Sequence, residues 1–212
     1  IDGRMRQAKG DAGNRRRRQV LDAVELVKQR SQKAVYCCDP VMGDVGRGFF
    51  VRPGIPEFMR DRVVPKAQMV TPNHFELDFL TGRETHTLDE VIDAAHALRG
   101  VGPETVLVTS VAVDSTQPDE LAMLAVTGEG AWHVTTPRLD RGFTGSGDLT
   151  AAMFLAHYLR TESVAQALGQ TADIVYSVLK QTADSGLPEL QLVAAQDEIV
   201  SPTYHFDVRQ VR

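Results

Sequence analysis

The chain has 212 residues, of which 42% are hydrophobic and 24% are charged, and its formal net charge at pH 7 is -5. This composition is typical of a globular protein with a sizeable core, and it favours neither a nucleic acid nor a membrane as a partner. No apolar run approaches the roughly 20 residues that a membrane-spanning helix needs. The only cysteines, Cys37 and Cys38, are adjacent in an apolar run, which favours buried, reduced thiols and a cytoplasmic location.

The first 18 residues differ from the rest because they carry seven basic and two acidic side chains. We expect residues 1–19 to be a basic segment that is disordered or atypical for the fold, and residues 20–212 to form one α/β domain. The alternative, that the run Asn14–Gln19 contacts nucleic acid, lacks an aromatic platform or a recognised nucleic-acid motif to support it.

In chain order, helical and strand-like patterns alternate along the sequence. Thr87 with Glu90 forms a predicted capping box, Ser163 is a second predicted helix cap, and Gly82 is a predicted helix stop. The patterns predict helices over 16–29, 53–62, 75–80 and 87–99, from the loop at 145 onward, and from 163 to about 186. They predict strands over 34–38, 68–73 and 105–110, a hairpin over 120–136, and a weak edge strand within 191–212.

This alternation predicts an α/β fold with a doubly wound, mostly parallel sheet. In such folds ligands bind beyond the carboxyl ends of the strands. Oxygen-bearing side chains follow three of the predicted strands: Asp39 after the first, Thr71, Asn73 and Glu76 after the second, and Thr109 with Ser110 at the end of the third. Oxygen ligands beside phosphate groups suit Mg²⁺.

The segment Gly145-Ser146-Gly147-Asp148 precedes eleven residues that are almost uncharged. We expect these residues to form a buried core helix, with the glycines in its first turn. Unpartnered N–H groups at a helix start bind anions, and glycines allow a ligand to approach the backbone closely. Asp148 is then either a simple helix-start charge or a base that takes a proton from an attacking hydroxyl.

A purely structural interpretation remains open for each of these strand-end residues. Asn73 and Glu76 could form only a helix cap and its reciprocal partner, and Asp39 before Pro40 could be only part of a turn. Three oxygen-rich strand ends together with one anion-binding loop nevertheless favour phosphoryl transfer.

Four segments resemble pyridoxal kinases of the ribokinase-like superfamily: CDPVMGD (38–44), VVPKAQMVTPNHFELDFLTGR (63–83), GPETVLVTS (102–110) and GSGDLTAAMFLA (145–156). The resemblance implies phosphorylation of the 5'-hydroxymethyl group of pyridoxal by ATP in vitamin B6 salvage. It also implies Mg²⁺ and a monovalent cation as cofactors, pyridoxal and related B6 vitamers as substrates, a cytoplasmic homodimer, and neither nucleic acid nor membrane as a partner.

The resemblance also implies roles for individual residues. Asp148 would be the catalytic base and contact the substrate, and Gly145, Ser146 and Gly147 would form the anion hole. Asp39 and Glu76 would organise the metal. The ATP-binding set would be Asp39, Thr71, Asn73, Glu76, Thr109, Ser110, Arg141, Gly142, Phe143 and Thr144. Residues 44–48 fall in a loop that helps to cover the site.

The family pattern that should precede residue 20 has no counterpart here, so we expect an N-terminally incomplete ribokinase-like domain. On that basis we expect self-association and little pyridoxal phosphorylation by this chain alone. One alternative function is a non-catalytic nucleotide-binding remnant. A second is hydroxymethylpyrimidine kinase, whose family usually has cysteine where Asp148 stands.

Overall fold

The computed structural model describes residues 19–212, and the basic segment 1–18 lies outside the described residues. The chain divides into two compact units, one ending at Tyr36 and the other spanning Cys37–Arg212. In the first unit residues 19–30 are helical, which agrees with the described part of the predicted helix over 16–29. The predicted domain boundary at residues 19 and 20 stays a prediction. None of the helices in the described part of the chain is long and apolar enough to span a membrane.

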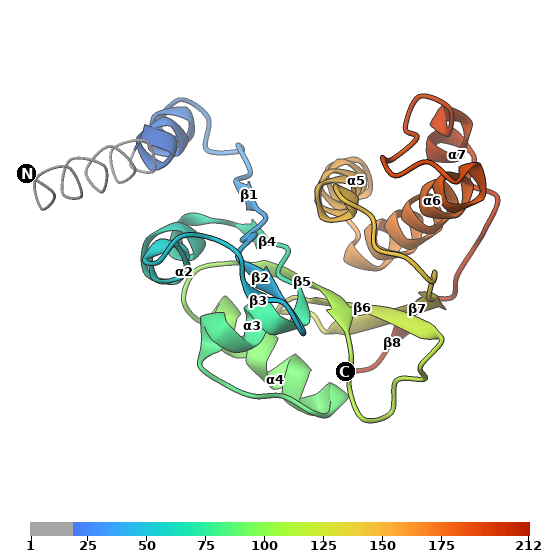
Figure 1. Ribbon diagram of the computed structural model, residues 1–212. Helices are drawn as coiled ribbons and strands as arrows, with labels where there is room; N and C mark the ends of the chain where they lie inside the picture. Colours follow the sequence, from blue (N-terminus) through green and yellow to red (C-terminus); the bar gives the residue numbers. More distant parts are fainter. Residues whose placement is uncertain (1–18) are drawn as a thin grey trace, which may run out of the picture. The chain divides into compact units, whose positions relative to one another are not determined.

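The second unit is built on a six-stranded sheet with the order β1-β4-β5-β6-β7-β8 (Figure 1). The first three of these strands are parallel, and each later strand pairs antiparallel with its neighbour. A separate antiparallel hairpin is formed by β2 and β3. The strands are β1 Cys37–Cys38, β2 Gly43–Asp44, β3 Gly48–Phe49, β4 Met69–Val70, β5 Thr105–Val111, β6 Glu120–Val126, β7 Ala131–Pro137 and β8 Arg209–Gln210.

Helices cover both faces of this sheet, which confirms the predicted α/β architecture (Figure 1). One face carries α3 His74–Thr81 and α4 Leu88–Arg99, and the other carries α5 Ser146–Thr161 and α6 Val164–Ser185. Between β3 and β4 the chain forms α2 Ile55–Phe58, the π-helical turn η1 Met59–Val63 and the 3₁₀ turn η2 Val64–Lys66, and α7 Gln196–Val200 follows α6.

The helix boundaries follow the capping chemistry in the sequence. Thr87 and Glu90 form the predicted capping box of α4, and the Ser163 hydroxyl accepts a hydrogen bond from the Gln166 N–H at the start of α6. Helices α3 and α6 end at Gly82 and Gly186, whose φ angles of 66° and 70° are left-handed and suit glycine. These local predictions are confirmed.

The first strands are shorter than predicted. Of the expected strand over 34–38 only Cys37 and Cys38 pair, because their partner β4 contributes only Met69 and Val70 to the ladder. On the side of β1, pairing beyond β4 ends at Thr71, whose N–H donates to the Cys38 carbonyl, because Pro72 has no N–H to continue it. On the side of β5, Asn73 still forms an isolated parallel bridge with Thr109.

The main core lies between the sheet and the helix pair α5 and α6. It contains Leu107 and Val134 from the sheet and Phe154, Leu168 and Ala172 from the helices, and each of these residues is at most 1% exposed. The expectation that α5 is buried on all sides is wrong. Only Leu149, Thr150 and Phe154 are buried, because α5 packs on α6 and the sheet through one face, and its opposite face is open and includes Leu159, which is 55% exposed.

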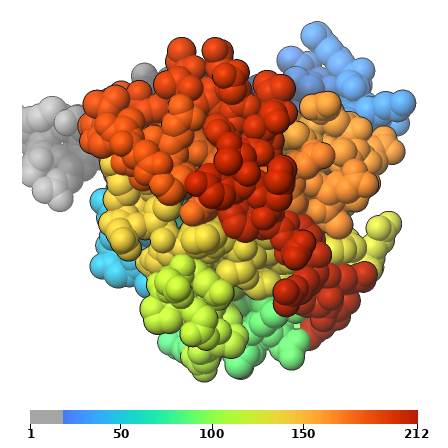
Figure 2. All heavy atoms as spheres, turned by 90° about the vertical axis from the view of Figure 1, so that its right-hand side faces the viewer, coloured from blue at the N-terminus to red at the C-terminus, as the bar shows by residue number. Residues whose placement is uncertain are grey.

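The C-terminal tail, dark red in Figure 2, runs over the surface of the molecule, and β8 near its end is an edge strand of the sheet. Tyr204 N–H donates to Ser177 Oγ and Phe206 N–H donates to Asp173 Oδ1, so the tail is fixed to α6 by hydrogen bonds. The predicted edge strand is confirmed as β8, which pairs with Trp132 and His133 of β7. The short helix α7 was not predicted.

Candidate functional site

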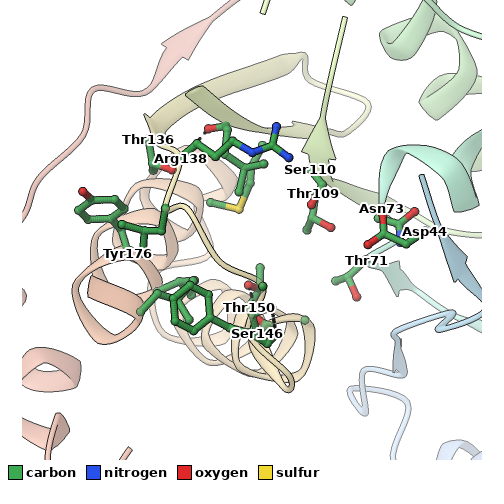
Figure 3. A pocket seen from close by; sticks show the side chains of 18 of the residues that line it. Asp44, Thr71, Asn73, Thr109, Ser110, Thr136, Arg138, Ser146, Thr150 and Tyr176 are labelled. Carbon is green, nitrogen blue, oxygen red and sulfur yellow. Dashed lines mark hydrogen bonds between the residues drawn. The ribbon is translucent and has the colours of Figure 1, made fainter. Parts of the chain in front are cut away.

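A cavity of about 410 Å³ opens where the carboxyl ends of β1, β4 and β5 face the start of α5 (Figure 3). The structure brings most of the predicted site residues to its wall. These are Asp39, Thr71, Asn73, Glu76, Thr109, Ser110, Arg141, Gly142, Phe143, Ser146 and Gly147. Gly145, Thr144 and Asp148 do not line it.

The glycine loop forms the first turn of α5 as predicted. Gly145 is the residue before the helix and has φ 87°, a left-handed conformation that suits glycine. The Ser146 hydroxyl donates to the Phe143 carbonyl at 2.9 Å. Within residues 19–212 the N–H groups of Gly147 and Asp148 have no hydrogen-bond acceptor. The helix start therefore offers free N–H donors to an anion at the cavity wall.

Gly147 also brings this loop close to the end of β1. A Cβ atom added to Gly147 would lie 3.6 Å from Asp39 Oδ2. The free N–H groups of α5 and the Asp39 carboxylate therefore face the same small volume, although Asp39 and Gly147 are far apart in the sequence.

Asp148 is exposed on the first turn of α5, at the rim of this volume rather than in the cavity wall. It is close enough to Asp39 for its negative charge to contribute to that carboxyl's raised pKa. An exposed carboxylate at the rim can accept a proton from a hydroxyl that approaches from solvent.

The Asp39 carboxyl is an unpaired acid in a partly buried position. Burial raises its pKa from 3.8 to about 6, the nearby Thr71 hydroxyl lowers it, and the charge of Asp148 raises it further. Thr71 Oγ1 is itself buried and makes no hydrogen bond of ordinary geometry to any described residue. Both groups are therefore left to interact with a ligand in the cavity.

Glu76 is 3% exposed and is held by three backbone donors. Its Oε1 accepts from the N–H groups of Met42 (2.7 Å) and Gly43 (3.3 Å), and its Oε2 accepts from the Asn73 N–H (3.0 Å). Burial raises its pKa from 4.5 to about 7, these N–H groups lower it, and the charge of Asp39 raises it. Glu76 thus ties the start of α3 to the base of the hairpin formed by β2 and β3.

Asn73 completes the same connection. Its Oδ1 accepts from the Glu76 N–H at 2.9 Å, which is the reciprocal half of a capping box, and its Nδ2 donates to the Gly43 carbonyl at 2.8 Å. The structural interpretation of Asn73 and Glu76 as a helix cap is confirmed. The same two side chains also hold the hairpin formed by β2 and β3.

Thr109 and Ser110 lie in an irregular part of β5, where the pairing with β6 shifts between Val108 and Val111. Ser110 has φ 51°, a left-handed conformation that is uncommon for residues other than glycine. Such strain often marks a functional position. Both residues line the cavity (Figure 3).

The segment before the glycine loop is stiffened by its own side chains. The Arg141 guanidinium lies 5.1 Å from the centre of the Phe143 ring, and its Nη2 donates to the Leu187 carbonyl at 2.7 Å. Thr144 forms an isolated parallel bridge with Glu189. These contacts attach the segment 141–144 to the loop after α6.

Several wall residues were not identified from the sequence. One end of the cavity is apolar, between the hairpin β6–β7 and α6, and Arg47 and Arg138 add positive charge. The inward alternation along β6 and β7 was a usable signal for part of this wall. Asp44 and Arg47 belong to the loop 44–48 that was expected to cover the site. The additional residues are Val41, Gly43, Phe50, Leu121, Met123, Thr136, Pro137, Arg138, Leu139, Thr150, Ala172, Val175, Tyr176 and Leu179.

The carboxylates of the cavity wall bear on whether it can hold Mg²⁺. No cluster of three or more His, Cys, Asp or Glu side chains suited to a metal exists in residues 19–212. Mg²⁺ is often held by only one or two carboxylates together with water and substrate phosphates. Asp39 and Glu76, two carboxylates whose pKa values are raised and which form no ion pair within the described residues, fit that kind of site.

Comparison with known proteins identifies the family. A family model described as phosphomethylpyrimidine kinase matches residues 16–190. A pyridoxal kinase PdxY from Rubrobacter xylanophilus is 52% identical over 91% of this chain and 67% of its own length, and one from Leifsonia xyli is 48% identical over 91% and 68%. The chain belongs to the pyridoxal kinase family.

A solved structure supports the same assignment. Pyridoxal kinase from Leishmania donovani, in complex with ADP and pyridoxamine, matches with a TM-score of 0.80 and 27% identity over 92% of this chain and 70% of that chain. The predicted resemblance to pyridoxal kinases and the predicted ribokinase-like fold are therefore confirmed. The chain spans about two thirds of the length of these pyridoxal kinases.

Proposed function

We propose that this protein transfers the γ-phosphoryl group of ATP to the 5'-hydroxymethyl group of pyridoxal. The observation that carries the proposal is the meeting of the free N–H groups at the start of α5 with the Asp39 carboxylate at one cavity. A donor-rich helix start suits phosphate oxygens, and an adjacent carboxylate suits the cation that accompanies them. The family membership of the chain supports pyridoxal as the acceptor.

In this proposal Asp148 accepts the proton of the substrate hydroxyl as that oxygen attacks the γ-phosphorus. Its exposure at the rim keeps the carboxylate available to a substrate that enters from solvent. The backbone N–H groups of the 145–147 loop and of Asp148 stabilise the charge on the transferred phosphoryl oxygens. Phosphoryl transfer depends mainly on this positioning and electrostatic stabilisation.

Asp39 and Glu76 would hold Mg²⁺, which when bound supplies neutralisation of the phosphate charge. Both carboxylate oxygens of Glu76 accept hydrogen bonds from backbone N–H groups. Glu76 would therefore mainly hold the base of the β2–β3 hairpin in place and add negative charge near the metal. Asp39 has the more accessible oxygens. Thr71, Thr109 and Ser110 add hydroxyl groups toward the phosphates.

The apolar end of the cavity suits the base of the nucleotide. Leu121 and Met123 of β6 face Tyr176 of α6 there, and Phe143 lies on the same wall. Apolar side chains with a few polar groups are typical of small-molecule sites. Arg138 and Arg141 also line the cavity and add positive charge to its wall.

Two competing functions deserve a direct comparison. The description of the matching family model names phosphomethylpyrimidine and so favours a substituted pyrimidine as substrate, whereas aspartate at position 148 and the pyridoxal kinase relatives favour pyridoxal. A non-catalytic protein that binds nucleotide is the other alternative. The monovalent cation, the homodimer and the cytoplasmic location stay predictions.

The test combines product formation with binding. Pyridoxal, pyridoxine, pyridoxamine and hydroxymethylpyrimidine are each offered with ATP and Mg²⁺, and calorimetry measures binding of ATP with Mg²⁺. We expect pyridoxal to give the highest kcat/KM of the four acceptors, with a low absolute rate for this chain alone. Faster phosphorylation of hydroxymethylpyrimidine would overturn the substrate assignment, and nucleotide binding without any product would favour the non-catalytic alternative.

A further inference from the structure

A buried histidine outside the cavity wall connects the strained part of β5 to helix α3. His74 is 5% exposed and follows Asn73 as the first residue of α3. Its Nδ1 accepts a hydrogen bond from the Ala112 N–H at 3.1 Å, and its Nε2 lies 2.7 Å from Thr85 Oγ1. Both ring nitrogens are therefore used.

These contacts fix which nitrogen carries the proton. Because the Ala112 N–H can only donate, Nδ1 must be the unprotonated acceptor, and the ring proton is then on Nε2. Nε2–H donates to Thr85 Oγ1, and the Thr85 hydroxyl donates in turn to Asp78 Oδ1 at 2.8 Å. Asp78 is on the same helix as His74, so the chain of hydrogen bonds returns to α3 and fixes the orientation of the ring.

The segment from Pro72 to His74 accepts hydrogen bonds from both sides of the irregular part of β5. On one side, the Thr109 N–H donates to the Pro72 carbonyl at 2.9 Å. On the other side, the Ala112 N–H donates to His74. Ser110, with φ 51°, lies between these two hydrogen bonds. A strained residue keeps its conformation only where its surroundings determine it, and these two bonds provide that constraint.

We propose that His74 is a positioning residue that holds Thr109 and Ser110 in the conformation needed to contact the nucleotide phosphates. The inference rests on the proposed function, because it takes the phosphates to lie at these hydroxyl groups. His74 itself does not line the cavity and acts only through the backbone at Ala112.

Two substitutions of His74 separate its two hydrogen bonds. Asparagine has an amide oxygen near the position of Nδ1, so His74→Asn can keep the bond from Ala112 while losing Thr85. Glutamine extends to the position of Nε2, so His74→Gln can keep the contact with Thr85 while losing the bond from Ala112. Thr85→Val is a third variant, which removes the Thr85 hydroxyl and leaves the Ala112 bond in place.

The measurements are the Kd for ATP with Mg²⁺ by calorimetry, hydrogen exchange of the Ala112 amide, and Tm. We expect His74→Gln to raise the Kd about tenfold and to speed exchange at Ala112, since the part-buried Ala112 N–H loses its acceptor. His74→Asn and Thr85→Val should lower Tm with little change in Kd. A Kd that follows Tm in all three variants, or unchanged exchange at Ala112 in His74→Gln, would overturn the proposal.

A second pair of variants changes the donor of the Ala112–His74 hydrogen bond instead of its acceptor. It serves as the test if the His74 variants do not fold. Ala112 is exposed, and Ala112→Pro removes its N–H while Ala112→Ser keeps it. We expect a higher Kd for ATP only in the proline variant, and equal Kd values in both would contradict the proposal. If the unsubstituted protein bound no nucleotide, the proposed function would fail, whereas the exchange measurement would still report on the role of His74.

Discussion

Gly147 and Asp39 face each other so closely that a Cβ on the glycine would come within 3.6 Å of the carboxylate oxygen Oδ2. That separation is an ordinary van der Waals contact, so a methyl group can be accommodated there. It would nevertheless occupy the space between the free N–H groups of α5 and Asp39. The absence of a side chain at position 147 therefore matters for a ligand more than for the fold.

Gly147→Ala tests this relationship. We expect the variant to be as stable as the unsubstituted protein, because alanine favours helices and nothing in its surroundings must move. The Kd for ATP should rise about tenfold, since the methyl group displaces phosphate from the cradle. Calorimetry and urea unfolding measure the two quantities.

Gly145→Ala is the matched comparison. Its φ of 87° is unfavourable for alanine, so we expect a loss of about 1 kcal/mol in the free energy of unfolding. If the two variants lost the same stability and the same affinity, the distinction between the two glycines would be wrong.

Asp39→Asn should raise the free energy of unfolding while lowering kcat. The Asp39 pKa rises from 3.8 to about 6 on folding because the carboxylate is partly buried. Between these pH values the folded protein binds more protons than the unfolded chain, so stability falls as pH rises through this window. At pH 8 the variant should gain about 1 kcal/mol, a value reduced for partial solvent exposure, and most of its kcat should be lost.

Asp93→Asn is the control with the opposite sign. Arg212 lowers the pKa of Asp93 through a hydrogen bond, so this surface carboxylate favours the folded state when it is charged. Its removal should not stabilise the protein at pH 8. A loss of stability in Asp39→Asn at pH 8 would show that the Asp39 carboxylate is well accommodated in the folded protein.

Glu76→Ala tests the connection between α3 and the hairpin. The substitution leaves the N–H groups of Met42, Gly43 and Asn73 without their acceptor, and unsatisfied buried groups cost about 1–3 kcal/mol. Glu90→Ala removes the corresponding residue of the exposed capping box of α4, where water can replace the carboxylate. Urea unfolding should show the larger loss for Glu76→Ala, and equal losses would contradict the anchoring role.

The parts of the fold that were predicted correctly depend on neighbouring residues. Thr87 with Glu90, Ser163 and Gly82 mark helix ends through local hydrogen bonds or backbone conformation, and these signals are present in the sequence. The glycine loop at 145–147 and the oxygen-bearing strand ends likewise follow from short patterns. The cavity therefore contains most of the residues expected from them.

What could not be predicted depends on distant contacts. The left-handed Ser110 has no sequence signal, because its conformation is held by Pro72 and His74 from another strand end. The exposed face of α5 was missed because a helix with apolar residues on every side has the same composition whether or not one face is covered, and here Leu159 is 55% exposed. The hydrogen bonds from Met42 and Gly43 to Glu76 could not be anticipated because they join positions more than 30 residues apart.

The role of Asp148 is the central claim. Because little phosphorylation is expected from this chain alone, the most direct test is the rate of pyridoxal 5'-phosphate formation, with saturating ATP and Mg²⁺, by a version extended to the length of the pyridoxal kinase relatives. Asp148 is exposed, so Asp148→Asn should leave folding intact while lowering kcat about a hundredfold or more, as loss of a general base does. Asp140→Asn, an exposed acid outside the cavity wall, is the control and should change kcat less than about twofold. Equal rates in the unsubstituted protein and Asp148→Asn would contradict the assignment of Asp148 as the base.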